Sequence, residues 1–215
     1  MASYTNGNKF FGIFSLLAFI ALSSTQTTTA TSHRLRSLYL RMLVSCNQLQ
    51  VSRDELSSAI TQTRDVSGVI HHSSVDSISG LDAHLGDVSV FDQEEIGNIP
   101  DLLINHLTYL KLTEGALRLY QQDELVLKIV DDSLTTYEHQ LETIIKNVVN
   151  IRKTINIIIQ IFGRTFDSGS VQEVTFDACD ITTTTCITRR GLYILQEFDY
   201  YLRIARRNFV TLSSS

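Results

Sequence analysis

The stretch "YEHQLETIIKNVVNIRKTINIIIQIF", from Tyr137 to Phe162, decides the fold of this chain. Its apolar residues recur at steps of four and three, which places them along one face of an α-helix. Thr135 and Glu138 match a capping box at its start, and Gly163 fits a helix end. The apolar residues are Tyr137, Leu141, Ile144, Val148, Ile151, Ile155, Ile158 and Phe162. Burying them contributes on the order of 12–24 kcal/mol before entropy, so we expect this helix to lie in a core.

Three other segments show the same helical spacing. One begins after Asn98 with Pro100 in its first turn, where proline is tolerated. In another, Ser52 and Glu55 match a second capping box, which leaves open a kink or a restart within that helix. Together with the first stretch, these patterns predict helices over about 33–65, 99–131, 134–162 and 187–212.

The lengths of the connections predict how the helices run. About thirty residues (Val66–Glu95) separate the first two predicted helices, and about twenty (Gly163–Cys186) separate the last two. Only the short region Asp131–Ser133 separates the middle pair. Short connections join antiparallel neighbours, whereas long ones can cross the bundle. We therefore expect an all-α, long-chain four-helix bundle of up-up-down-down topology with two long crossover loops.

The N-terminal residues have the pattern of a secretory signal peptide. An apolar run, "FFGIFSLLAFIAL" (Phe10–Leu22), is shorter than the roughly 18 residues that a spanning helix needs. Small and polar residues follow, so we expect a signal peptide over 1–30, cleaved between 23 and 32, and one secreted domain over 31–215. A membrane anchor or a buried N-terminal helix is the alternative. Loss of Lys9 takes the net charge from −5 to −6, which offers no electrostatic footprint for nucleic acid or an anionic membrane.

Three cysteines remain after the predicted signal peptide: Cys46, Cys179 and Cys186. An odd number in a secreted chain allows one internal disulfide and leaves one thiol over. Cys179 and Cys186 are close in sequence, and this makes them the preferred pair.

No motif for catalysis or cofactor binding occurs in the chain. Gly-rich nucleotide signatures, His-Glu-x-x-His, Cys-x-x-Cys and Gly-x-Ser-x-Gly are all missing. A di-iron bundle needs Glu-x-x-His on two helices, and no glutamate has a histidine at that spacing. His71 and His72, with His84 in the same loop, form the one cluster that suits a metal, and adjacent loop histidines are usually just solvated. We expect no enzyme activity, no cofactor and no metal.

Charged residues gather on the fourth predicted helix. Arg189 and Arg190 lie where this helix should begin, the end that disfavours cations. Either the helix starts later, or a loop carries both residues, or they face a partner. Glu197 and Asp199 fall on opposite sides of the helix, and a solvated position is expected for both rather than acid–base chemistry.

The segment "GLYILQEFDYYL" (Gly191–Leu202), followed by "RIARRNFVTL" (Arg203–Leu212), resembles the last helix of interleukin-6-type helical cytokines, and the sequence match is specific over Gly191–Glu197 alone. The similarity is to the branch of ciliary neurotrophic factor and leukaemia inhibitory factor, and the first three helices match it in pattern alone. The resemblance implies a secreted, monomeric ligand without catalysis. Such a cytokine would assemble glycoprotein 130-type receptors and trigger JAK/STAT signalling.

Members of this family use up to three receptor-binding surfaces, and the resemblance places two of them as follows. One engages the transducer glycoprotein 130 through exposed residues of the first and third helices. Its candidates here are Arg36, Arg41, Gln48, Lys146, Arg152 and Lys153. Another, near the end of the fourth helix and the first long loop, binds a specificity-setting alpha receptor, and its candidates are Arg203, Arg206 and Arg207.

The remaining surface lies at the start of the fourth helix and engages the leukaemia inhibitory factor receptor in this family. The usual Phe-x-x-Lys pattern falls on Thr185 and Thr188, so its aromatic and its lysine are absent. Ile187 and Arg190, three residues apart, are the nearest chemical substitute. This departure leaves the second receptor open, and the candidates are Thr185, Ile187, Thr188, Arg189 and Arg190.

A secreted helical carrier of lipid or of a small apolar ligand is the alternative function. A carrier is expected to have wide apolar helix faces, basic flanks and little need for a fixed topology. The narrow apolar stripe of one helix and the long–short–long connections favour the cytokine.

Overall fold

The computed structural model describes residues 7–64, 98–171, 173–175 and 184–214, with side chains from residue 31 onward. Every regular element in these ranges is a helix. The α-helices are α1 (Gly7–Thr63), α3 (Ile99–Val130), α4 (Glu138–Ile161) and α5 (Thr184–Ser214), and a short 3-10 turn, η3, covers Ser168–Ser170. The predicted all-α fold class is confirmed.

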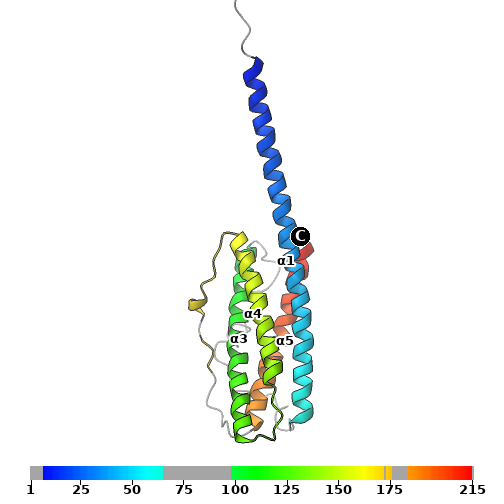
Figure 1. Cartoon of the computed structure of the whole chain (residues 1–215), viewed down its shortest axis with the longest axis vertical. Coiled ribbons are helices and arrows are strands. Elements are labelled where there is room, and N and C mark those ends of the chain that lie inside the picture. Colours follow the sequence, from blue (N-terminus) through cyan, green and yellow to red (C-terminus); the bar gives the residue numbers. More distant parts are fainter. Residues whose placement is uncertain (1–6, 65–97, 172, 176–183, 215) are drawn as a thin grey trace, which may run out of the picture.

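The four long helices pack around one shared hydrophobic core (Figure 1). α1 packs against α4 and α5, and α3 packs against the same two helices. Each helix therefore has two neighbours, in the order α1, α5, α3, α4 around the bundle. The N-terminal part of α1 projects beyond the other three helices (Figure 1).

The segment Tyr137–Phe162 contains α4, and its predicted apolar face points toward the core. The residues of the predicted apolar stripe from Tyr137 to Ile158 are buried, whereas Phe162 lies beyond the helix and is 36% exposed. Gly163 ends the helix with a φ of +70°, the left-handed conformation that glycine adopts without strain. Its amide donates to Gln160 O at 3.0 Å, and the amide of Arg164 donates to Ile159 O at 3.1 Å. These two bonds are a Schellman motif, as the sequence indicated.

Neither of the two predicted capping boxes marks the start of a helix. α4 begins at Glu138 rather than 134, without a side-chain cap, and in the turn before it Asp131 accepts hydrogen bonds from Ser133. α1 continues without a break through Ser52, since Leu49, Leu56 and Ile60 keep one buried stripe across that point. The proline prediction is correct: α3 starts at Ile99 with Pro100 in its first turn.

The start of α5 differs from the predicted one. The helix begins at Thr184, three residues earlier than expected, so Arg189 and Arg190 lie within the helix rather than in a loop. This register turns Ile187, Thr188 and Gly191 toward the core.

Candidate functional site

α5 and α3 approach each other closely at Gly191. A Cβ atom at this position would lie 2.2 Å from Cζ of Tyr120, well inside any van der Waals contact. Tyr120 is fully buried, so its ring cannot move aside without disturbing the core. Packing therefore requires the glycine that begins "GLYILQE".

The five candidates at the start of the fourth helix divide between core and surface. Ile187 and Thr188 are 0% and 1% exposed, so the predicted apolar anchor is a core residue. Arg190 pairs with Asp123 of α3, Nη1 to Oδ2 at 2.6 Å. Thr185 is exposed and Arg189 is half-buried, and these two remain on the surface. The early start of α5 explains the correction, because it rotates positions 187, 188 and 191 inward.

The pKa of the Asp123 carboxyl group reflects the burial of its ion pair with Arg190. Burial raises the pKa of Asp123 above its usual value, and the hydrogen bond and charge of Arg190 only partly oppose this effect. Arg190 therefore has a structural partner within the bundle, which Arg189 lacks in the described part of the chain.

Arg64, directly after α1, joins all four helices at one end of the bundle. Its guanidinium donates to Glu124 of α3, Nη1 to Oε1 at 2.7 Å and Nη2 to Oε2 at 2.6 Å. It also donates to Thr135 O at 3.2 Å, ahead of α4, and to the Thr188 hydroxyl of α5 at 3.4 Å. The Tyr137 ring lies 4.9 Å from its Cζ, within cation–π range. We call these five residues the Arg64 cluster.

The charges of the Arg64 cluster are almost completely shielded from water. Only 5% of the Arg64 side chain and none of the Glu124 side chain is exposed. Burial by itself lowers the pKa of Arg64, but the hydrogen bond and charge of Glu124 outweigh it and raise that pKa. Sequence reasoning missed this cluster, although Glu124 continues the apolar stripe of Leu117 and Tyr120 and was therefore recognisable as a core position.

Asp199 is a second buried carboxylate, on the α1–α5 contact. It accepts a 2.6 Å hydrogen bond from Gln50 and ion pairs with Arg53 of α1 and with Arg203 one turn further along α5. Burial alone raises the pKa of Asp199, but the hydrogen bond from Gln50 and the two arginine charges bring it below its usual value. The solvated position expected for Asp199 is wrong, because the register of α5 turns it toward α1.

His106 of α3 is fully buried and was not singled out by its sequence context. Its Nδ1 lies 3.0 Å from the Tyr201 hydroxyl, and its Nε2 lies 3.2 Å from Nδ2 of Asn208, both on α5. The Phe209 ring packs beside it at a centroid distance of 5.1 Å. Burial lowers the pKa of His106 to about 3, so the ring is neutral at physiological pH.

The transducer candidates on α1 and α4 are exposed with one exception. Arg36, Arg41, Gln48, Lys146 and Lys153 lie on the surface. Arg152 instead forms an ion pair with Glu114 of α3, and its side chain is 21% exposed. The choice of Arg152 for its exposure is corrected, since its partner on the neighbouring helix was not readable from spacing within α4.

Exposed apolar side chains form two groups on the described surface. On α1, Leu40, Val44 and Val51 fall within roughly 40° of one another around the helix. At the end of α3, the exposed residues are Leu125, Ile129 and Val130, with Ile129 84% exposed. The candidates Arg203, Arg206 and Arg207 are exposed near the end of α5.

Cysteine and metal predictions fall partly outside the described residues. Cys186 is disulfide-bonded and Cys46 is free and buried. Cys179, the predicted partner of Cys186, and the three histidines His71, His72 and His84 lie outside the described residues. Within the described residues, no group of histidine, cysteine or acidic side chains is arranged to hold a metal.

No helix among the described residues combines the length and apolar character that crossing a bilayer requires.

Comparison with protein family models, with curated proteins and with solved structures finds no match to this chain.

Proposed function

We propose that this chain is a secreted helical cytokine of the interleukin-6 type, which assembles glycoprotein 130-type receptors to start JAK/STAT signalling. The observation that carries the proposal is the meeting of the four helices at the Arg64 cluster. Arg64 follows the last residue of α1, and Glu124 lies in the last two turns of α3. Their partners Tyr137 and Thr188 lie at the starts of α4 and α5.

This meeting of ends supports an up-up-down-down topology. If the last residues of α1 and α3 lie beside the first residues of α4 and α5, the first pair runs opposite to the second pair. Two long crossover connections then have to return the chain from one end of the bundle to the other, as in cytokine bundles. The resemblance of Gly191–Glu197 to the last helix of these cytokines points the same way.

A first receptor-binding surface, for glycoprotein 130, is proposed on α1 and α4. Thr63 and Tyr137 are hydrogen-bonded at one end of these neighbouring helices. Val44 lies 19 residues before Thr63 and Ile157 lies 20 residues after Tyr137, so both are about 30 Å from that end. Both are exposed, at 55% and 42%. The surrounding exposed cations and glutamine would form its polar rim: Arg36, Arg41, Gln48, Lys146 and Lys153.

A second surface, for a related signalling receptor such as the leukaemia inhibitory factor receptor, is proposed at the Arg64 end. The pair of Arg190 with Asp123 brings the start of α5 beside the last two turns of α3. The surface side chains there include the exposed Thr185, Leu125, Ile129 and Val130 and the half-buried Arg189. Exposed apolar residues beside a cation are what an interface uses as anchors. Ile129 replaces Ile187 as the proposed apolar anchor, because Ile187 is in the core.

A third surface, for a specificity-setting alpha receptor, is proposed at the end of α5. Arg206 and Arg207 are exposed there, and Arg203 is 71% exposed although it pairs with Asp199. Cations near a helix C-terminus are also favourable to the helix dipole. At this surface, a contribution to helix stability explains the three arginines as well as receptor binding does.

The test is a signalling assay on two cell lines that both express glycoprotein 130, only one of which also expresses the leukaemia inhibitory factor receptor. The protein is added in increasing amounts, and STAT phosphorylation is measured. We expect a response at nanomolar concentrations in the line with both receptors. Absence of phosphorylation in every line, including lines supplied with alpha receptors, would overturn the proposal.

Surface variants separate the two main contacts. Val44→Asp is expected to weaken binding to purified glycoprotein 130, and Ile129→Asp to weaken binding to the second receptor only. Tyr200→Asp, at a residue of α5 that is 43% exposed and outside the three surfaces, is the control. Equal loss in all three variants would show a general defect rather than two contacts.

A further inference from the structure

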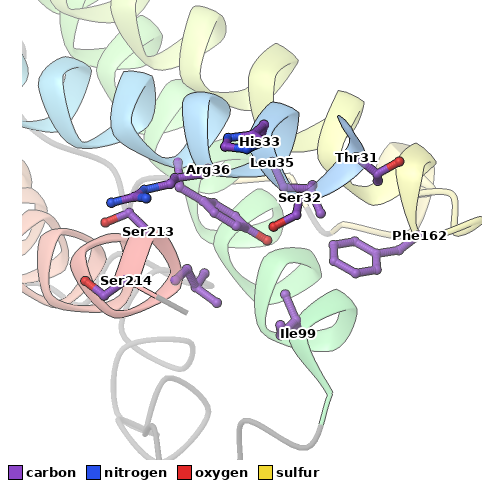
Figure 2. Close-up of a pocket in the computed structure, with 11 residues that line it drawn as sticks. Thr31, Ser32, His33, Leu35, Arg36, Ile99, Phe162, Ser213 and Ser214 are labelled. Atoms are coloured by element: carbon purple, nitrogen blue, oxygen red, sulfur yellow. The ribbon is translucent and has the colours of Figure 1, made fainter. Parts of the chain in front are cut away.

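The end of the bundle opposite the Arg64 cluster contains a pocket of about 570 Å³. Residues from α1, α3 and α5 line it, together with Phe162 after α4 (Figure 2). This volume is in the range of pockets that bind small molecules, about 300–1,000 Å³. The pocket is far from the proposed second-receptor surface and is not needed for it.

One side of the pocket is apolar. It is formed by Leu35, Tyr39, Ile99, Phe162 and Leu212. Phe162 belongs to the apolar stripe of α4 but is 36% exposed, whereas the stripe residues before it are buried. An apolar ligand would cover this ring and remove its surface from water.

One wall carries a hydrogen-bonding group that the protein leaves unused. Tyr39 is 4% exposed, and its hydroxyl has no hydrogen-bond partner among the residues that the structure describes. A buried hydroxyl without a partner is destabilising, so such groups usually meet an acceptor. Burial raises the pKa of Tyr39 to about 12, and the hydroxyl is therefore a donor at neutral pH.

The polar side of the pocket favours an anion. Figure 2 shows Arg36 extending toward Ser213 on one side, with Ile99 and Phe162 on the other. The Ser213 and Ser214 hydroxyls already donate to Val210 O, at 2.8 and 2.9 Å. Among the described residues that line the pocket, none is acidic. Thr31, Ser32 and His33 also line the pocket, and the Arg36 guanidinium and the Tyr39 hydroxyl are the donors considered for the ligand's head group.

We propose that this pocket binds a single-chain amphiphile with a carboxylate head, of the fatty-acid type. The carboxylate accepts hydrogen bonds from Arg36 and Tyr39, and the alkyl chain lies against Leu35, Ile99 and Phe162. Among the described residues that line the pocket, Arg36 carries the one permanent positive charge, which matches the single charge of a carboxylate. A phosphate head would leave part of its charge unmatched in a mostly apolar pocket.

Displacement of a fluorescent fatty acid tests the proposal on the purified protein. The probe is 11-(dansylamino)undecanoic acid, and the competitors are dodecanoate and dodecan-1-ol. We expect saturable binding of one probe per chain and displacement by dodecanoate. Dodecan-1-ol should compete about tenfold more weakly, because it lacks the charge that strengthens these hydrogen bonds. No probe binding, or equal competition by acid and alcohol, overturns the proposal.

Two variants and one control assign the head group. Tyr39→Phe should weaken dodecanoate binding about tenfold, and Arg36→Gln about threefold to fivefold, since that cation is exposed. Arg34→Gln, an exposed cation two residues away that does not line the pocket, should leave affinity unchanged.

The stability of the Tyr39→Phe variant is measured beside its affinity. Because the lost hydroxyl has no partner, thermal unfolding of the unliganded variant should occur at the same temperature as in the wild type, or higher. Undiminished dodecanoate affinity in both pocket variants places any binding elsewhere and overturns the proposal. A loss in Tyr39→Phe accompanied by a lower unfolding temperature does so too, because the hydroxyl then has a structural partner.

Discussion

Arg64 and Glu124 form two parallel hydrogen bonds, of 2.7 and 2.6 Å, in a place where 5% and 0% of their side chains are exposed. The pair joins residues 60 positions apart in sequence. A buried pair of opposite charges stabilises little relative to two apolar residues, but it strongly disfavours any arrangement in which one charge is left alone. The pair lies where α1 and α3 end. It therefore favours the packing arrangement in which these two helix ends lie side by side.

Removing one member of this pair is expected to destabilise the fold. Glu124→Leu leaves Arg64 buried without its carboxylate and should lower the free energy of unfolding by about 3–5 kcal/mol. Urea denaturation followed by circular dichroism measures the change. The double variant Arg64→Met/Glu124→Leu should recover most of the loss, because no buried charge remains. If the double variant is as unstable as the single one, the pair is not the cause.

Gly191 is expected to be intolerant of any side chain. Gly191→Ala gains up to about 1 kcal/mol of helix propensity but forces a Cβ into the Tyr120 ring, and such overpacking typically costs about 1–3 kcal/mol. A net loss of stability is expected in chemical denaturation. Gly115→Ala is the matched control, since its Cβ would only touch Val174 at 3.5 Å. That variant should be as stable as the wild type or more so.

The stability of the protein should fall in mild acid because of His106. Its folded pKa of about 3 lies below the unfolded value of 6.5, so the unfolded state takes up the proton first. The contribution is complete above pH 6.5 and is lost at about 1.4 kcal/mol per pH unit as the pH falls toward 3. Denaturation at pH 7.5, 6.0 and 4.5 gives this slope.

A variant assigns the acid slope to one residue. His106→Gln should be less stable at neutral pH but should lose much of the slope between pH 6.5 and 4.5. His139→Gln, at an exposed position of α4, should retain it. An unchanged slope in His106→Gln would contradict the assignment. Asp199 contributes to acid sensitivity separately. Because its folded pKa is depressed, its stabilising effect is lost only when the pH falls below the ordinary pKa of an aspartate.

Arg189 and Arg190 are expected to have different roles although they are adjacent. Arg190→Ala removes the pair with Asp123 and should lower the free energy of unfolding by about 1–2 kcal/mol. Arg189→Ala should leave stability unchanged and weaken binding to the second receptor. Denaturation and binding to purified receptor are measured on both variants. A stability loss in Arg189→Ala would show that it too is structural.

The sequence predicted those parts of the fold that depend on local spacing. The apolar stripe of α4 specifies its buried face, and Gly163 specifies its end, because both effects act within a few residues. The start of α5 was not predictable in the same way. That helix begins at Thr184, and the contact of Gly191 with Tyr120, on another helix, fixes its register.

The polar core was the larger omission, and its cause is physical. Glu124, His106 and Asp199 each depend on partners 60 to 149 positions away, which spacing within one helix does not reveal. Exposure of Arg36 and Lys146 could be read from helical register alone. Arg152 could not, because Glu114 on a neighbouring helix decides its environment.

The two ends of the bundle are expected to respond differently to temperature. Charged hydrogen bonds close the end at Arg64, whereas apolar contacts of Leu35, Ile99 and Leu212 line the other end. Apolar attraction weakens on cooling. In the cold, amide hydrogen exchange should therefore accelerate first in the opening turn of α3 and the closing turn of α5, while the junction around Arg64 stays protected.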